Sequence, residues 1–184
     1  MKKAFVIITI LMCCSPFGVF AQRYGSVGQN SIVQFKVVNH IIFKTTVNGT
    51  FQELKGTIVF DPSRLEKSFF DVSVAVKTIS TGIAMRDRDL LKEKYFNQQK
   101  YPRITIKSKT ITRGEGGSSY VLDGNLTIKG ITKPISFPFK AGIANGVYQF
   151  KGHFQINRMD FNVGPDNSID KNVSIELSVT TKSL

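Results

Sequence analysis

Two pairs of charged residues are the main candidates for chemistry in this chain: Arg86 with Asp87, and Arg158 with Asp160. Neither pair comes with a recognisable nucleophile, and the chain has no phosphate-cradling loop, nucleophile elbow or HExxH pattern. We interpret the first pair as a helix-start ion pair or a clamp on a neighbouring strand. We interpret the second as a turn that pins one end of the fold. All four residues are expected to be structural, and no enzymatic activity is predicted.

Metal and thiol chemistry have few candidate ligands. The only histidines are His40 and His153, and both cysteines, Cys13 and Cys14, lie close to the N-terminus. Two imidazoles without cysteine ligands do not favour a zinc site. The sequence therefore predicts no metal site, no disulfide in the mature protein and no cofactor.

The first 21 residues have the pattern of a secretory leader. Two lysines precede an apolar run, and Val19-Phe20-Ala21 forms a small-residue cleavage site before Gln22. This predicts a signal peptide over residues 1–21 and a mature domain over residues 22–184, periplasmic or secreted. Lipidation of one of the two cysteines, as in a bacterial lipoprotein, is the alternative.

The chain is strongly basic. Lysine and arginine number 25 against 13 aspartate and glutamate, a net charge of +12. Removing the two leader lysines leaves +12 − 2 = +10. Most basic residues alternate with apolar ones, as on the solvated face of a strand, and no basic run indicates a nucleic-acid partner. Simple solubility explains this charge, and a transient contact with an anionic membrane surface is the alternative.

The elements that position these residues are strands, because apolar residues recur at every second position along most of the chain. Asn48-Gly49 is interpreted as one of the turns, and Pro134 and Pro138 indicate an edge or bulged strand. Eight strands are predicted, around residues 33–37, 54–60, 70–76, 104–106, 122–128, 135–139, 148–156 and 173–179.

One segment departs from this period. Residues 84–97 place Leu90, Leu91 and Phe96 among charged residues and end before Tyr101-Pro102. This predicts one amphipathic helix, a helical insertion between strands 3 and 4. We expect the helix to cover one end of the fold and to gate ligand entry.

Eight antiparallel strands are most simply arranged as an all-β, up-and-down barrel without open edges. A two-sheet sandwich is the alternative, although the immunoglobulin pattern of Cys and Trp is absent. At this strand number, the interior is either filled by side chains or holds one small ligand.

Several motifs occur in a specific order and spacing. They include VKTISTG at residues 76–82, followed by Arg86-Asp87, then GNLTIKGITKP at residues 124–134 and NRMDFNV at residues 157–163. Together they resemble the YceI-like family of exported polyisoprenoid-binding proteins, over residues 30–181. The resemblance implies an eight-stranded antiparallel lipocalin-like barrel that holds an isoprenoid chain in its interior.

The apolar faces of the predicted elements provide the candidate lining of such a cavity. A packed core without a cavity is the alternative interpretation of the same residues. The candidates are Phe35, Val37, Phe60, Val72, Val74, Val76, Leu90, Phe96, Ile104, Ile106, Leu126, Ile128, Phe150 and Phe154.

The predicted function is to bind and sequester or carry an isoprenoid lipid, either a polyprenyl chain or an isoprenoid quinone. Burial of each methylene contributes about 0.8 kcal/mol, so a few isoprene units suffice for tight binding without a catalytic residue. Two alternatives remain: an enzyme that acts on a hydrophobic substrate in the same cavity, and a periplasmic stress or structural protein with a filled core.

Overall fold

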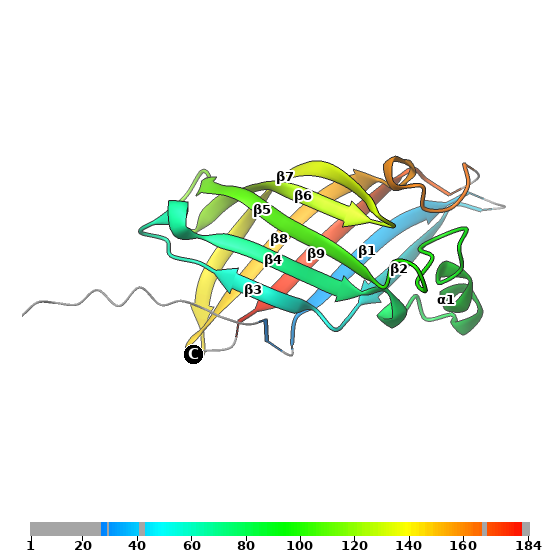
Figure 1. The fold of residues 1–184 in the computed structure, drawn as a ribbon, viewed down its shortest axis with the longest axis horizontal. Coiled ribbons are helices and arrows are strands. Elements are labelled where there is room, and N and C mark those ends of the chain that lie inside the picture. Colours follow the sequence, from blue (N-terminus) through cyan, green and yellow to red (C-terminus); the bar gives the residue numbers. More distant parts are fainter. Residues whose placement is uncertain (1–26, 29, 41–42, 167–168, 182–184) are drawn as a thin grey trace, which may run out of the picture.

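The computed structural model describes residues 27–28, 30–40, 43–166 and 169–181, so the predicted leader and its cleavage site lie outside the described residues. The described chain is an antiparallel sheet curled into a barrel-like shape, with one α-helix (Figure 1). Its strands are β1 (Ile32–Asn39), β2 (Thr45–Phe51), β3 (Lys55–Val59), β4 (Phe69–Ala75), β5 (Arg103–Arg113), β6 (Ser119–Ile128), β7 (Ile131–Ala144), β8 (Val147–Asn157) and β9 (Asn172–Thr180). The helices are α1 (Ala84–Leu90) and the short 3-10 turns η1 (Leu65–Lys67), η2 (Val76–Thr78) and η3 (Arg158–Phe161).

The sheet has the order β2-β1-β9-β8-β7-β6-β5-β4-β3, so its two edge strands, β2 and β3, are consecutive in the chain. They do not form a ladder with each other, so the expectation of a barrel without open edges was wrong. Side chains hold the short connection between them. The Gln52 N–H donates to Thr78 Oγ1 at 2.9 Å, and Arg103 Nη2 donates to the Glu53 carbonyl at 3.1 Å. Arg103 also binds the Ser73 carbonyl of β4 at 2.7 Å, which ties this connection to the neighbouring strand.

The prediction of a turn at Asn48-Gly49 was wrong, because both residues lie within β2 and pair with β1. A Cβ atom on Gly49 would lie 2.2 Å from the Phe35 ring, so the glycine makes room for an aromatic side chain on the neighbouring strand. The sheet therefore has nine strands rather than eight. The helical insertion falls between β4 and β5.

The helix is also shorter than predicted, since α1 ends at Leu90 rather than at residue 97. The chain continues as hydrogen-bonded turns, in which the Phe96 N–H donates to the Leu90 carbonyl at 3.1 Å. Asn97 has a left-handed φ of 48°, which a continuous helix does not allow. These turns let Leu90, Leu91 and Phe96 all pack against one apolar cluster.

The two prolines of β7 lie in the part of that strand that pairs with a neighbouring strand on one side only. β7 pairs with β6 from Ile131 to Lys140, but it pairs with β8 only from Phe139 onward. Pro134 and Pro138 lie in the half that pairs with β6 alone, where a missing N–H is tolerated. β7 as a whole is an interior strand of the sheet, and only the part that contains the two prolines is unpaired on one side.

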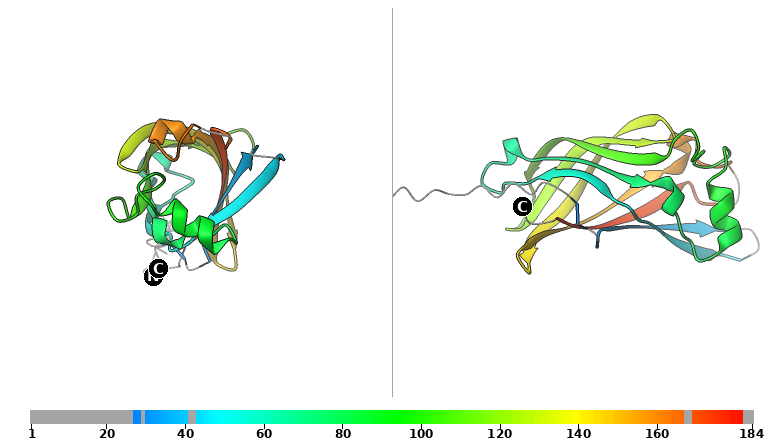
Figure 2. Two further views of the ribbon diagram at one scale, coloured as in Figure 1. Left: turned by 90° about the vertical axis from the view of Figure 1, so that its right-hand side faces the viewer. Right: turned by 60° about the horizontal axis from the view of Figure 1, so that its bottom comes forward.

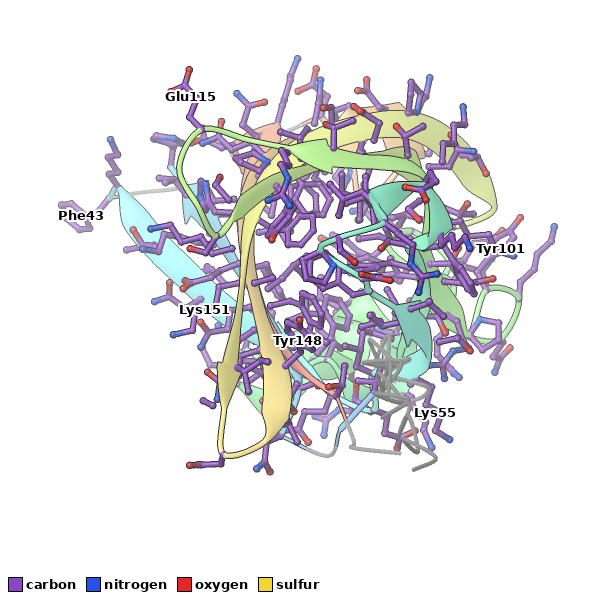
Figure 3. All side chains as sticks on the ribbon, turned by 90° about the vertical axis from the view of Figure 1, so that its left-hand side faces the viewer. Phe43, Lys55, Tyr101, Glu115, Tyr148 and Lys151 are labelled. Atoms are coloured by element: carbon purple, nitrogen blue, oxygen red, sulfur yellow. The ribbon has the colours of Figure 1, made fainter. Side chains whose placement is uncertain are left out.

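An aromatic cluster fills the half of the barrel away from α1. Phe60 is 1% exposed, and its ring lies 5.0 Å from that of Tyr120, 5.3 Å from Phe150 and 5.4 Å from Tyr148. Seen from this end, side chains crowd the interior around Tyr148 (Figure 3). Edge-to-face contacts of this kind contribute beyond the area that they bury, so this half is a packed core.

The turn after β3 is stabilised by the carboxylate of Asp61, a buried residue. Ser63 donates to it from its backbone N–H at 2.9 Å and from its hydroxyl, and Arg64 Nε donates at 2.8 Å. The hydrogen bonds from Ser63, followed by those from Arg64, lower the pKa of Asp61 from 3.8 to about 2 despite its burial.

Asp61→Asn is expected to lower the free energy of unfolding by about 1 kcal/mol at neutral pH. Because the pKa is lower in the folded chain than in the unfolded one, the ionised carboxylate stabilises the fold above about pH 4. This contribution is lost as the pH falls through about 2, and the two proteins should become equally stable below that pH. Denaturant titrations at several pH values measure the difference, and a difference that persists at the lowest pH would contradict the assignment.

Candidate functional site

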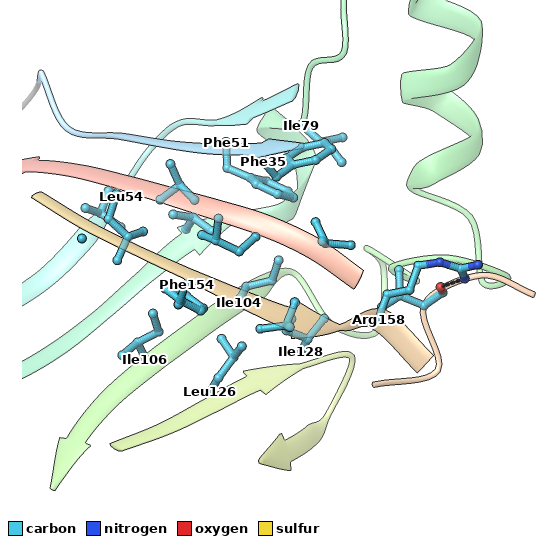
Figure 4. Close-up of a pocket in the computed structure, with 18 of the residues that line it drawn as sticks. Phe35, Phe51, Leu54, Ile79, Ile104, Ile106, Leu126, Ile128, Phe154 and Arg158 are labelled. Atoms are coloured by element: carbon cyan, nitrogen blue, oxygen red, sulfur yellow. Dashed lines mark hydrogen bonds between the residues drawn. The ribbon is translucent and has the colours of Figure 1, made fainter. Parts of the chain in front are cut away.

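The half of the barrel next to α1 contains a cavity of about 230 Å³ (Figure 4). Side chains from most strands of the sheet point into it, and nearly all of them are aliphatic or aromatic. Alternation along each strand produces this wall, because the same positions that face away from solvent face the inside of a curled sheet.

Most of the predicted lining residues lie on this wall. β1, β4 and β5 contribute pairs of inward residues, and α1 with the turns after it covers one end. The predicted residues on the wall are Phe35, Val37, Val72, Val74, Leu90, Phe96, Ile104, Ile106, Leu126, Ile128, Phe150 and Phe154.

Phe60 and Val76 were predicted to line the cavity, but neither lies on its wall. Phe60 faces inward, but it lies too far along the barrel axis and belongs to the aromatic cluster. Val76 is in η2 rather than in β4, and its N–H donates to the Pro102 carbonyl at 2.9 Å. The 3-10 turn ends the alternation on which its prediction was based.

Sequence reasoning missed several other wall residues. Phe51 lies in the unpredicted strand β2, so no alternation indicated it. Leu54 begins the predicted strand at residues 54–60 and could have been included because of its alternation with Ile58. Val33, Ile175 and Leu177 belong to strands that the alternation of apolar residues predicted. That alternation could have added them to the predicted lining. All five line the cavity, together with Ile79.

Polar groups lie on the wall mainly at the end beside α1, among them Asn39, Thr81, Arg86, Tyr95 and Arg158. Arg86 and Asp87 both bind Thr81: Arg86 donates to its hydroxyl at 2.8 Å and its carbonyl at 2.9 Å, and Asp87 accepts from its N–H at 2.8 Å. Ser80, the preceding residue, bridges to Thr50 in β2. The pair therefore fastens the start of α1 to the edge of the sheet.

The guanidinium of Arg158 is held by backbone carbonyls of the connection between η3 and β9. It donates to Val163 at 2.8 Å, to Ile169 at 2.9 Å and to Asp170 at 3.0 Å, and the residue is 6% exposed. Asp160 lies exposed on the same turn. Arg158 thus pins this end of the barrel (Figure 4), while Asp160 faces solvent.

This arrangement suits binding of an apolar molecule. An apolar cavity of about 150 Å³ is large enough to hold benzene, and the present cavity exceeds that size. Within the described ranges, no three His, Cys, Asp or Glu side chains gather closely enough to ligate a metal ion. The helices in the described part of the chain are too short or too polar to span a bilayer.

Relatives of the chain are bacterial. A UPF0312 protein of Pectobacterium atrosepticum is 26% identical over 177 residues, which cover 90% of this chain and 89% of that protein. A UPF0312 protein of Photorhabdus laumondii is 31% identical over 108 residues, 59% of this chain and 54% of the relative, so this match spans about half of that protein's length.

Solved structures show the same fold. BcnA of Burkholderia cenocepacia superposes with a TM-score of 0.75 at 25% identity, over 83% of this chain and 96% of that one. A polyisoprenoid binding domain from Saccharophagus degradans has a TM-score of 0.70 at 13% identity, over 89% and 100% of the two chains, and supports the fold alone. The profile of the YceI-like domain matches residues 24–181, nearly all of the described chain, and the chain therefore belongs to the YceI-like domain family.

Proposed function

We propose that this protein binds an isoprenoid lipid in its cavity and sequesters or carries it in the cell envelope, as a periplasmic or secreted protein. The observation that carries the proposal is the cavity itself: an apolar space inside the barrel, with its polar groups gathered at the end beside α1. A prenyl chain has no polar groups to satisfy along its length. It gains about 0.8 kcal/mol for each methylene that leaves water.

The polarity of the wall orients such a ligand. Its hydrocarbon tail packs against the deep residues, such as Ile106 and Leu126, and its polar end lies beside Thr81, Arg86 and Tyr95. The role that we propose is binding rather than catalysis, because the two arginines at this end are engaged in holding the fold. Arg86 binds Thr81, and Arg158 binds three carbonyls.

The expected result is that the exported, natively purified protein carries a prenyl lipid in near-stoichiometric amount. Organic extraction followed by mass spectrometry measures this, and protein denatured and refolded without lipid is the control. N-terminal sequencing of the same preparation tests the expected cleavage before Gln22. Repeated absence of any lipid from well-folded protein would count against the proposal.

A further inference from the structure

The end of the barrel that carries the cavity also carries an exposed apolar patch. Ile83 is 52% exposed, Met85 68% and Phe43 79%. Ile83 and Met85 lie at the start of α1, and Phe43 lies in the connection from β1 to β2. We call these three residues the rim patch. They are large apolar side chains with most of their surface in water, which indicates an interaction site when they gather at one place.

The elements that carry these three residues lie at the same end of the barrel. α1 lies across the end of the barrel, and the β1–β2 hairpin projects at the same end (Figure 2). Hydrogen bonds place the end of β1 beside the cavity: the Asp170 N–H donates to the Val38 carbonyl near the end of β1, and the Asp170 carbonyl accepts from Arg158, which lines the cavity. The other exposed apolar side chains are elsewhere, with Ile143 on the β7–β8 hairpin at the opposite end.

The same segment forms both the patch and the wall of the cavity. Leu90 and Phe96 line the cavity, whereas Ile83 and Met85 face solvent. None of the residues of α1 is buried. Apart from the bonds of Arg86 and Asp87 to Thr81, the helix has little buried surface, and segments with little buried surface open more easily than a core does. A ligand that enters beneath α1 therefore passes directly behind the patch.

Exposed cations lie close in the sequence to the residues of the rim patch. Lys44 follows Phe43, Arg88 lies one helical turn beyond Met85, and Lys94 lies in the turns after α1; all three are exposed. A basic side chain close to an anionic bilayer raises binding by roughly fivefold. Apolar side chains flanked by cations are the arrangement that peripheral proteins use at a membrane interface.

We propose that the rim patch docks on the surface of an anionic phospholipid bilayer, so that lipid passes between the bilayer and the cavity beneath α1 without crossing water. The passage of lipid rests on the proposed function, whereas the docking is a property of the surface itself. Ile83 and Met85 insert among the acyl chains and Phe43 adds a second contact, while Lys44, Arg88 and Lys94 meet the headgroups.

Vesicle flotation of the exported protein tests the docking. One set of vesicles is phosphatidylcholine with a minority of phosphatidylglycerol, and the other is phosphatidylcholine alone. The wild-type protein should float with the anionic vesicles, and the double variant Ile83→Asp, Met85→Asp should bind them about tenfold more weakly or worse. Ile143→Asp is the control for each single variant, Ile83→Asp and Met85→Asp, because it places one aspartate at a residue of similar exposure at the opposite end. It should float like the wild type.

A charge variant separates the two contributions. Lys44→Gln, Arg88→Gln and Lys94→Gln together should reduce binding to anionic vesicles and weaken the dependence of the remaining binding on salt. Unchanged melting temperatures confirm that the variants are folded.

Three outcomes would overturn the docking. The first is flotation that the Ile83 and Met85 changes do not affect. The second is an equal loss of vesicle binding in Ile143→Asp. The third is no flotation with either kind of vesicle, as expected if the patch binds a protein instead. Lipid extraction from the same preparations tests the proposed function separately from the docking. Protein that floats without copurifying lipid supports docking and contradicts the proposed function. Lipid-loaded protein that never floats supports the proposed function and contradicts docking.

Discussion

Val74→Trp is expected to lower the amount of copurifying lipid about tenfold or more while leaving the barrel folded. Val74 lies on β4, is 5% exposed and faces the cavity opposite Ile104 of β5. The indole occupies space that the hydrocarbon chain would otherwise fill. In a closely packed core, the same substitution costs roughly 1–3 kcal/mol because neighbouring side chains are forced aside. A cavity takes up the larger ring, so the melting temperature should change little.

Val121→Trp is the matched control for this experiment. Val121 lies on β6 between the buried residues Tyr120 and Leu122, so its side chain is on the outer face of the sheet and away from the cavity. It should retain its lipid. If Val74→Trp instead keeps its lipid and melts at a lower temperature, the barrel interior is a core rather than a container.

Arg158→Met should produce the largest loss of stability, about 3 kcal/mol or more in the free energy of unfolding. The methionine replaces much of the apolar stem but leaves the carbonyls of Val163, Ile169 and Asp170 without the donors that now satisfy them. A carbonyl that has lost both its donor and water costs more than the hydrogen bond itself is worth. The bond to Val163 is buried, and the bonds to Ile169 and Asp170 are partly buried. Denaturant unfolding measures the change.

Arg113→Met is the comparison, since Arg113 also donates to a backbone carbonyl, that of Pro62 at 2.6 Å, but from an exposed position. Water replaces an exposed donor, so this variant should lose less than about 1 kcal/mol. Equal losses in the two variants would show that Arg158 does not pin the connection between η3 and β9.

The strands were predictable because the alternation of side chains between two faces depends on the backbone alone. Phe70, Leu126 and Phe154 could be placed on inward faces without knowledge of their neighbours, and each faces inward in the structure. β2 was not predictable in this way. Its inward positions include Gly49, whose absent side chain is explained only by the ring of Phe35 on β1. That contact joins residues that are distant in the sequence.

The prediction of where α1 ends was wrong for a related reason. The composition of residues 84–97 favours helix throughout, but Leu90, Leu91 and Phe96 reach one apolar cluster only if the chain turns after residue 90. The cluster contains Val33 and Phe51 from β1 and β2, so tertiary packing overrode local propensity there.

By itself, the sequence determined the class of fold and which face of each strand is apolar, because both follow from local period and from the chemistry of single side chains. Only the tertiary structure decided at what depth each inward residue lies. Phe60 and Phe150 have the same pattern in sequence, yet Phe60 is sealed in the aromatic cluster while Phe150 also reaches the cavity. The curl of the sheet and the stagger of its strands set that depth, through pairings between residues far apart in the chain. The same pairings bring Arg158 to its three carbonyls and place Ile83, Met85 and Phe43 together at one end.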